Sequence, residues 1–367
     1  MGQAPAGETY NTMGRGHPLI AGAGDFGEVT PKATKFTTAP TKVSRAGDII
    51  LCIRATIGDR NWADGEYCLG RGVAGLAGRS GKLHQRFLWH WLGYAEPALK
   101  AKGRGATFLQ VNKADIGSME IPVPPLRDQR RIAAILDKAD ALRAKRRETI
   151  AKLDQLLQSM FLDLFGDSQT NSMNWPLLNL ADAAFFQEGP GVLAMDFRDD
   201  GVPLVRMAGL KEGKVTLKGC NYVDPEMLAR RWSHFSLSQG DILVLTSASF
   251  GNPSVVDVDT VGAIFYTGII RFRSNRQDLL PDFLKRFLAS PWFMRQAKIL
   301  ATGATIKHFG PTHLRRMEIP LPPVSVQQRF AKIAAKIEFE KREMQNSAEM
   351  HDALFASLQH RAFAGSL

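Results

Sequence analysis

Several glycine-containing stretches carry arginine, lysine and amide side chains that could bind nucleic acid. Glycine lets a backbone approach a ligand closely, lysine and arginine neutralise phosphate, and arginine or asparagine can read base edges through paired hydrogen bonds. Any one such charge is more often an ordinary solvated side chain, so the prediction rests on their concentration in matching loops. The predicted DNA-binding residues are Arg54, Arg60, Asn61, Arg71, Lys100, Lys102 and Arg104 in the first half of the chain, and Arg206, Lys211, Lys214, Ser249, Asn252, Lys307 and His308 in the second.

The net charge favours a polyanionic partner. Formal net charge is +11 and the pI is about 9.7, which is typical of nucleic-acid binding, with an anionic membrane surface as the alternative. The membrane alternative is weakened because no stretch approaches ~18 apolar residues and "MGQAPAGETYNTMGRG" has no apolar signal core. Cys52, Cys68 and Cys220 are too scattered for a disulfide frame, so we expect buried thiols and a cytoplasmic location.

No complete catalytic motif is found, which predicts a protein that is not an enzyme. "GRSGKL" at Gly78 lacks the glycine spacing and the Ser or Thr after Lys82 that a phosphate loop needs. "GNPS" at Gly251 lacks the second proline and aromatic residue of an adenine methyltransferase motif, and "PDFLK" at Pro281 has no spaced acidic partner for a nuclease metal. The eight histidines are not at ligand spacing with acids or cysteines, so we expect no metal and no cofactor on this chain.

The elements that must position the predicted loops are written twice. "MEIPVPPLRDQRRIAAI" begins at Met119 and "MEIPLPPVSVQQRFAKI" at Met317, so that 317 − 119 = 198. The triplet "GAT" recurs with the same shift, since 303 − 105 = 198. Further matches pair Gly16 with Gly201 and the "GDI" stretches at Gly47 and Gly240. Because these matches keep their order, the sequence predicts an internal repeat whose loops have diverged.

Each repeat ends in a long predicted helix with a heptad stripe. Residues 126–165 contain no glycine or proline and stop at Gly166, and "PLPPVSVQ" opens a second helix that runs nearly to the C-terminus. A sustained 3.5-residue period favours coiled-coil pairing, antiparallel and pseudo-two-fold, over the alternative that each helix lies on its own domain. The positions predicted for helix pairing and partner docking are Ile132, Leu136, Ile150, Leu153, Leu157, Met160, Leu164, Phe330, Ile337, Met344, Phe355 and Leu358.

These patterns predict an α+β protein with two similar mixed α/β domains separated by two antiparallel coiled-coil helices. The expected division is a first domain at 1–121, a central helix at 122–168, a second domain at 169–319 and a C-terminal helix at 320–367. Each helix of about 40 residues would extend about 60 Å, more than one small domain is wide. Such helices would act as spacers, and the two domains could contact a duplex at two separated stretches.

The chain resembles the DNA-specificity subunits of type I restriction-modification systems. The resemblance covers nearly the whole chain and rests on the paired "IPVPPLRDQRRIAAIL" and "IPLPPVSVQQRFAKIA" segments, on "LDQLLQSMFLDLFGD" and "LFASLQHRAFAG", and on "GQAPAGETYN" and "GDII". It implies two target-recognition domains that each read half of a split DNA sequence. It also implies partners: two modification subunits, which bind S-adenosylmethionine, and restriction subunits, which use ATP and Mg²⁺.

One departure concerns the start of the first domain. The second domain opens with "NWPLLNLADAAFFQEGPG" from Asn174, whereas "MGQAPAG" corresponds roughly to the region of Gly189, so about fifteen to twenty residues have no counterpart. Either the start is trimmed or misassigned, or the first domain lacks an edge element. Two other classes stay open at this point: a basic RNA-binding or scaffold protein, and a self-contained restriction enzyme, which would need the missing motifs.

Overall fold

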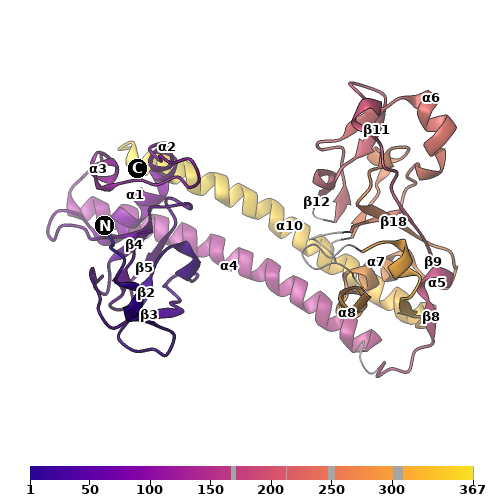
Figure 1. The fold of residues 1–367 in the computed structure, drawn as a ribbon, viewed down its shortest axis with the longest axis horizontal. Coiled ribbons are helices and arrows are strands. Elements are labelled where there is room, and N and C mark those ends of the chain that lie inside the picture. Colours follow the sequence, from indigo (N-terminus) through magenta and orange to yellow (C-terminus); the bar gives the residue numbers. More distant parts are fainter. Residues whose placement is uncertain (167–170, 212, 247–252, 301–308, 367) are drawn as a thin grey trace. The chain divides into compact units, whose positions relative to one another are not determined.

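The computed structural model describes every residue except 167–170, 212, 247–252, 301–308 and 367, and it divides into two compact units. Unit 1 comprises Met1–Thr149 with Met344–Leu367, and unit 2 comprises Ile150–Glu343. The predicted boundaries separated domains from helices, whereas these units divide each long helix between them (Figure 1). Among the described residues no helix is long and apolar enough to cross a membrane.

Unit 1 contains two small sheets and three short helices beside the long-helix segments. One sheet has the order β1-β3-β2-β6 and the other the order β5-β4-β7. The strands are β1 (Tyr10–Asn11), β2 (His17–Ile20), β3 (Lys35–Thr37), β4 (Ile49–Cys52), β5 (Arg60–Trp62), β6 (Cys68–Leu69) and β7 (Val73–Leu76). The helices are α1 (Gln85–Tyr94), α2 (Glu96–Ala101) and α3 (Lys113–Gly117), followed by the first long helix α4 (Leu126–Phe165).

Unit 2 contains sheets of the order β10-β14-β11-β17 and β12-β13-β16-β15-β18-β9, and the pair β19-β8. Its strands are β8 (Leu177–Asn179), β9 (Ala184–Glu188), β10 (Phe197–Arg198), β11 (Val202–Val205), β12 (Leu210–Lys211), β13 (Lys214–Val215), β14 (Asn221–Val223), β15 (Ile242–Leu245), β16 (Ser254–Val255), β17 (Ile264–Phe265), β18 (Ile269–Ser274) and β19 (Glu318–Pro320). Its helices are α5 (Leu180–Ala183), α6 (Pro225–Met227), α7 (Pro281–Ala289), α8 (Pro291–Leu300) and α9 (Pro311–Leu314), and the second long helix is α10 (Val324–Phe363).

The two units repeat one topology, as the duplicated sequence predicts. In each four-stranded sheet the third strand pairs antiparallel with the second and parallel with the fourth: β2 with β3 and β6, and β11 with β14 and β17. The "GDII" and "GDIL" stretches form the equivalent buried strands β4 and β15. Asp48 and Asp241 each accept a hydrogen bond from the backbone N–H three residues earlier, at 2.8 Å in both cases. The mixed α/β class and the internal repeat are therefore confirmed.

Gly2 in unit 1 and Gly189 in unit 2 occupy equivalent positions of the repeated fold. The residues before Gly189 have no counterpart in unit 1. Gly2 donates its N–H to the Val73 carbonyl (2.9 Å), and Gly189 donates to the Ile269 carbonyl (3.0 Å). A Cβ on either glycine would collide with backbone oxygens of the neighbouring turn. Strand β9 lies directly before Gly189 and pairs with one edge of β18. The strand of unit 1 that corresponds to β18 is β7, and among the described residues it pairs with β4 alone. The predicted correspondence between the start of "GQAPAG" and the region of Gly189 is thus confirmed.

The two long helices run antiparallel and pair in both units. In unit 1 Arg143 of α4 forms an ion pair with Asp352 of α10, and in unit 2 Asp154 of α4 pairs with Lys341 of α10. As the α4 partner advances from 143 to 154, the α10 partner falls back from 352 to 341. The two ion pairs also exchange under the repeat, because 341 − 143 and 352 − 154 both equal 198. Each unit therefore pairs its own segments of the two helices in the same way, as the internal repeat predicts.

The heptad stripe is buried, but it packs against more than the other helix. Ile132, Leu136, Phe355 and Leu358 join a core with α1, while Leu153, Leu157, Met160, Leu164, Phe330 and Ile337 join a core with α7 and α8. Ile150 and Met344 are half-buried. The sequence left two alternatives for each long helix: pairing with the other helix, or packing on its own domain. In the structure each helix does both. A long helix can satisfy both because its stripe is wide enough to face a helix and a domain at once.

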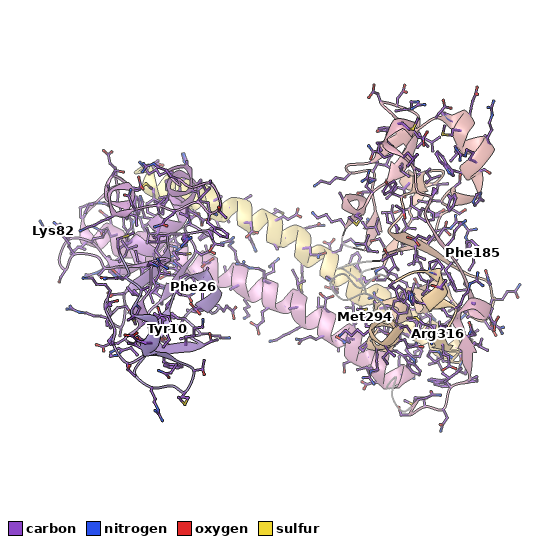
Figure 2. All side chains as sticks on the ribbon, in the orientation of Figure 1. Tyr10, Phe26, Lys82, Phe185, Met294 and Arg316 are labelled. Carbon is purple, nitrogen blue, oxygen red and sulfur yellow. The ribbon has the colours of Figure 1, made fainter. Side chains whose placement is uncertain are left out.

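A buried glutamine fixes the start of each long helix. The Gln129 amide donates to the carbonyls of Lys82 (2.9 Å) and Pro124 (2.7 Å), and its oxygen accepts from the backbone N–H of His84 (2.7 Å). His84 is the residue immediately before α1. Lys82, whose carbonyl accepts one of these hydrogen bonds, is labelled in Figure 2. Both N–H groups and the oxygen of the amide thus form hydrogen bonds to backbone groups. The fully buried side chain therefore leaves none of its donors unpaired.

Unit 2 contains the same arrangement around Gln327, which is 198 residues later. Its amide donates to the carbonyls of Asp278 and Pro322 and accepts from the N–H of Leu280, each at 2.8 Å. Leu280 is the residue before α7, just as His84 precedes α1. We call each arrangement the glutamine clamp. Because it joins three backbone segments, the clamp determines how the short helix of a domain meets the long helix.

Candidate nucleic-acid interface

Three loops of unit 1 that are distant in sequence meet around Ile53. Its N–H donates to the carbonyl of Gly72 (2.9 Å), and its carbonyl accepts from the N–H of Val111 (3.0 Å). These bonds bring together residues 53–58, 70–72 and 103–111, which we call the loop surface. Each segment carries one predicted DNA-binding arginine, namely Arg54, Arg71 and Arg104, and all three are exposed. The structure thus gathers on one surface cations that the sequence predicted separately.

The loop between α2 and α3, which are labelled in Figure 1, is closed by hydrogen bonds of its own backbone. Arg104 and Gln110 exchange two backbone hydrogen bonds of 3.0 and 2.9 Å, which close the loop, and Ala55 donates to the carbonyl of Leu109 (2.9 Å). The guanidinium of Arg104 is anchored to the buried carboxylate of Asp115 at 2.9 Å. Ala55 has a φ of 62°, a region that costs free energy for a residue with a Cβ. Strained residues of this kind are concentrated at functional sites.

Lys100 lies on α2, the helix that enters this loop, and Lys102 is the residue that follows its last turn. The Lys100 ammonium bonds Glu96 (2.5 Å), which raises the pKa of the lysine, and Lys102 donates to the Ser118 hydroxyl (3.2 Å). Lys100 is exposed and Lys102 is half-buried. Both add positive charge beside the loop surface, although both already have protein partners.

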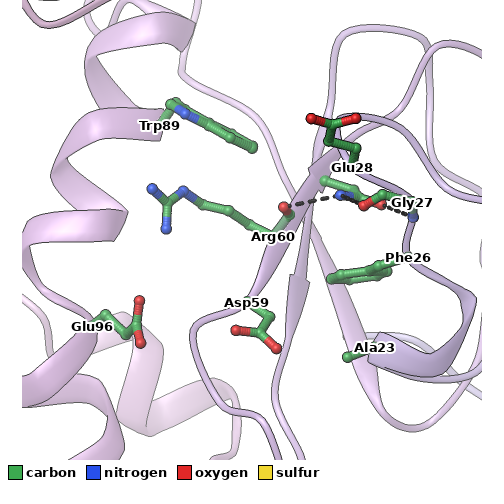
Figure 3. A pocket seen from close by; sticks show the side chains of 9 residues that line it. Ala23, Phe26, Gly27, Glu28, Asp59, Arg60, Trp89 and Glu96 are labelled. Carbon is green, nitrogen blue, oxygen red and sulfur yellow. Dashed lines mark hydrogen bonds between the residues drawn. The ribbon is translucent and has the colours of Figure 1, made fainter. Parts of the chain in front are cut away.

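Asn61 and Arg60 do not lie on the loop surface. Asn61 is buried, where its amide oxygen accepts from the Gly27 N–H (3.0 Å) and its amide nitrogen donates to the Gly27 carbonyl (3.1 Å). Arg60 is half-buried in the wall of a hollow of about 350 Å³ with Trp89 and Glu96 (Figure 3). Burial lowers the pKa of Arg60, outweighing nearby acids. The geometry gives both side chains structural roles and does not support a DNA contact by either.

Arg60 is at one end of a stack in which two indoles lie between two cations. Its guanidinium lies 4.7 Å from the Trp89 ring centre, and Trp89 stacks on Trp62 at 4.6 Å and 20°. Arg86 covers the other face of Trp62 at 5.1 Å. Cation–π and stacking contacts of this kind stabilise by about 0.5–2 kcal/mol each, depending on burial. The sequence predicted a DNA contact for Arg60 because the packing of its guanidinium on Trp89, which lies in another element, depends on the tertiary fold.

The predicted residues of unit 2 fall into two groups. Arg206 is half-buried, bonded to Asn221 and stacked over Tyr266 at 4.3 Å. Lys211 and Lys214 face each other across the β12–β13 hairpin and are exposed. Lys214 also pairs with Val255 of β16. Ser249, Asn252, Lys307 and His308 lie outside the described residues, in the counterparts of loops 53–58 and 103–111.

The residues predicted to dock partners are occupied inside the protein. Leu157 is buried against Phe283 and Phe330 in the core of unit 2, and Met160 and Leu164 pack against the same core. Phe161 and Phe165 are buried there as well. A continuous apolar stripe does not reveal which part a domain covers. The apolar side chains that do stay exposed on the helices are Leu142, Leu156, Leu162, Phe339, Met350 and Leu354.

A charged junction joins α4 to α1 in unit 1. The Asp137 carboxylate accepts from Arg86 (2.6 and 3.1 Å) and contacts the buried His90 ring at 2.7 Å. Burial lowers the pKa of His90, outweighing the carboxylate beside it. Burial of Asp137 opposes its ionisation, but the bonds from Arg86 and His90 prevail and lower the pKa of the carboxyl. In unit 2, Glu338 of α10 pairs instead with Lys285 and Arg286 of α7.

No group of three or more histidine, cysteine or acidic side chains that could hold a metal ion occurs in the described part of the chain. Cys52 and Cys68 are buried as expected, whereas Cys220 is half-exposed. The side chains singled out by the structure but missed from the sequence are Phe108 on the loop surface and the clamp residues Gln129 and Gln327. The repeated glutamine was a usable signal, since it stands at the same position of both "PP" helix starts.

Comparison with known proteins identifies the family. Residues 14–154 and 194–345 each match the type I restriction modification DNA specificity domain, and together they cover most of the chain. The chain belongs to this family and carries its domain twice. The resemblance stated from the sequence is thereby confirmed.

Individual relatives carry matching names. The chain is similar to the MjaX type I restriction enzyme specificity subunit of Methanocaldococcus jannaschii, at 36% identity over 44% of this chain and 39% of the relative. It is 26% identical to the MjaVIII specificity subunit of the same organism, over 73% of this chain and 68% of the relative. The fold resembles the solved S subunit from M. genitalium, with a TM-score of 0.52, 14% identity and coverage of 99% and 92%. The match to MjaX thus spans well under half of that relative.

Proposed function

We propose that this chain is the DNA-recognition subunit of a type I restriction-modification complex and that it reads a bipartite duplex sequence. The observation that carries the proposal is the doubled specificity domain, found as two matches to one family and as two units of one topology. Each unit would read one half of the target. An RNA-binding scaffold would share the positive charge, but it gives no reason for two equivalent domains with divergent loops.

The loop surface is the part of unit 1 that we assign to DNA. Arg54, Arg71 and Arg104 are exposed there on loops held by backbone hydrogen bonds. Such cations bind phosphate and fix the protein on the duplex, while polar side chains between them read base edges. In unit 2 the β12–β13 hairpin with Lys211 and Lys214 supplies exposed positive charge.

The long helices offer two equivalent docking positions for partner subunits. Leu156 on α4 and Leu354 on α10 are 47% and 55% exposed, and 354 − 156 = 198. Equivalent exposed leucines in two repeats favour two copies of one partner, since a pseudo-symmetric surface presents the same contact twice. We propose modification subunits as that partner, joined in the complex by restriction subunits.

The chemistry would belong to these partners. We propose that this chain is not catalytic and binds no cofactor, and that S-adenosylmethionine, ATP and Mg²⁺ are used by the modification and restriction subunits. This chain would recognise the DNA target sequence, and its partners would methylate adenine or cleave the DNA. Because the DNA is chromosomal or invading, we place the complex in the cytoplasm.

Mapping methylated adenines in a host that carries the complete system tests the function. With this gene present, we expect a two-part methylated sequence with a fixed gap, and without it that sequence should be unmodified. The double variant Leu156→Asp and Leu354→Asp should abolish methylation and co-purification of the modification subunit, because two buried carboxylates would oppose the apolar contact.

The matched control places the same charges one residue away, with Gln155→Asp and Ala353→Asp, which are also exposed and also 198 residues apart. This control should keep methylation and assembly. An unchanged methylome in the absence of the gene would refute the recognition function, whereas normal assembly of the leucine variant would refute only the docking position.

A further inference from the structure

Phe108 is a large aromatic side chain that unit 1 leaves in water. It is 56% exposed, and its neighbour Leu109 is 46% exposed. Isolated exposed apolar residues are common and need no explanation. Phe108 differs because it lies within the closed loop between Arg104 and Gln110, where backbone bonds of 3.0 and 2.9 Å hold the loop ends together. The side chain is therefore presented on a fixed support.

The closed loop depends on a glycine. Gly105 has a φ of 139°, and a Cβ there would lie 2.3 Å from the Phe108 carbonyl oxygen. On the other side, Asn112 caps α3 in a capping box with Asp115, the acid that also anchors Arg104. The loop is thus restrained at both ends. Restraint lowers the entropy lost when a loop side chain binds a partner.

The surroundings of Phe108 are cationic. The Arg54 guanidinium lies 5.8 Å from the centre of its ring, and Arg104 belongs to the same loop. Arg71 is on the third segment of the loop surface, hydrogen-bonded through Ile53. An apolar side chain among exposed arginines matches a nucleic acid, which offers stacked bases between rows of phosphates. A protein partner that buried the same patch would have to neutralise these charges as well.

We propose that Phe108 is a wedge that inserts at a base step of the DNA half-site bound by unit 1. Arg54 and Arg104 would hold the flanking phosphates while the ring unstacks one step. This inference rests on the proposed function and adds a residue that reads DNA through its deformability. The second repeat has Ile306 at the matching position after its own "GAT", in a segment outside the described residues.

The test uses the full chain in the assembly in which it is purified. The probe is a duplex with the methylated sequence, carrying 2-aminopurine at successive steps of each half-site, and a second duplex of scrambled sequence. Wild-type protein should raise the fluorescence at one step of one half-site. Phe108→Ala should remove that signal and weaken specific binding by about tenfold, as losing one base–aromatic stack does. Binding to the scrambled duplex should change less than about twofold.

Matched variants separate the wedge from other causes. Met13→Ala removes an exposed apolar side chain from the turn after β1 in unit 1 and should leave both signals intact. Phe108→Trp should retain the fluorescence change, and an unchanged melting temperature of Phe108→Ala would show that the unit stays folded.

Two outcomes overturn the proposal. One is specific binding by Phe108→Ala equal to that of Met13→Ala. The other is a loss of partner subunits with DNA binding unchanged, which would assign Phe108 to a protein interface. If wild-type assembly itself failed to prefer the methylated sequence, the proposed function would fail instead.

Discussion

Units 1 and 2 share their backbone supports and differ in the side chains that cover them. Each has a glutamine clamp and an aspartate that accepts from the backbone three residues earlier. The fifth residue of α1 is Trp89, in an aromatic stack, whereas the fifth residue of α7 is Lys285, in an ion pair. Contacts from side chain to backbone survive because they depend on the path of the chain. A contact between two side chains can differ between the units, because both residues can be replaced by another pair that also interacts.

The hairpin beside β5 and β16 shows the same contrast. Trp62 donates its N–H to the Val29 carbonyl, and Val255 donates to the Gly213 carbonyl, so residues 26–31 correspond to the β12–β13 hairpin. Unit 1 has the exposed Glu28 in this hairpin, whereas unit 2 has the exposed Lys211 and Lys214. Because Val29 corresponds to Gly213, Glu28 matches Glu212 in the sequence, and Gly27 and Thr30 match Lys211 and Lys214. The hairpin of unit 2 therefore carries two cations that the hairpin of unit 1 lacks. The two units should accordingly differ in how tightly they hold phosphate.

The largest effect should follow from breaking the clamp that both units share. Gln129→Leu or Gln327→Leu leaves one backbone N–H and two carbonyls buried without their partner. We expect each change to lower the free energy of unfolding of its own unit by about 3 kcal/mol or more, at roughly 1–3 kcal/mol per orphaned group. Calorimetry with proteolysis of the separate units would measure it. Gln328→Leu, at an exposed neighbour, is the control, and equal losses from Gln327 and Gln328 would contradict the clamp.

Acid should distinguish the units. The pKa values of His90 and Asp137 are both lowered in unit 1, so the unfolded chain takes up protons before the folded one. Stability from His90 is complete above its ordinary pKa of about 6.5 and falls as pH drops toward the lowered value, and Asp137 extends the loss below its ordinary 3.8. Unit 1 should therefore unfold before unit 2 as pH falls from 7 to 5.

The junction itself gives a smaller, measurable change. Asp137→Asn should cost about 1.5–3 kcal/mol through weakened charged hydrogen bonds. It should also steepen the loss of stability of unit 1 below pH 7, because the pKa of His90 falls further without the carboxylate that opposes the effect of burial. Hydrogen exchange followed by mass spectrometry would report each unit separately. Identical acid profiles for wild type and Asp137→Asn would show that another group controls the transition.

The smallest expected effects concern the two hairpins. Lys214→Glu should weaken DNA binding and reduce the slope of log K against log salt by about 1, as loss of one phosphate contact does. Glu28→Lys should strengthen binding to the scrambled duplex, because it replaces an acid with a cation in the hairpin that lacks the lysines of unit 2. Titrations between low and moderate salt would compare them. A neutral result for both would mean that the hairpins face away from the DNA.

The sequence was most informative where a pattern is local. The absence of glycine and proline between 126 and 165, with Gly166 after it, indicated α4, although the predicted central helix at 122–168 was a few residues too long at each end. Gly166 has a φ of 82°. The "GDI" strands and the repeat were equally readable because each depends on a short segment. Arg54, Arg71 and Arg104 could be nominated singly, but their convergence depends on bonds of Ile53 to residues far along the chain.

Tertiary packing explains what the sequence could not show. Asn61 and Arg71 are both polar residues beside glycine-rich turns, yet one is buried against Gly27 and the other exposed. Leu157 and Leu156 are adjacent leucines, and only the position of α7 decides which of them is covered. Phe108 was overlooked because an aromatic residue is usually expected inside, and nothing in its local sequence marks it as exposed.

The clamps also restrict how these helices can change in evolution. Each helix has a glutamine hydrogen-bonded to backbone in its first turn and ends at a phenylalanine, Phe165 or Phe363, that is buried in a core. One inserted residue would turn everything beyond it by about 100° and drive leucines out into water. Seven inserted residues would restore the orientation to within about 20°. The lengths of such helices should therefore differ between related proteins by multiples of seven residues, which is about two helical turns. Their genes should gain or lose codons seven at a time.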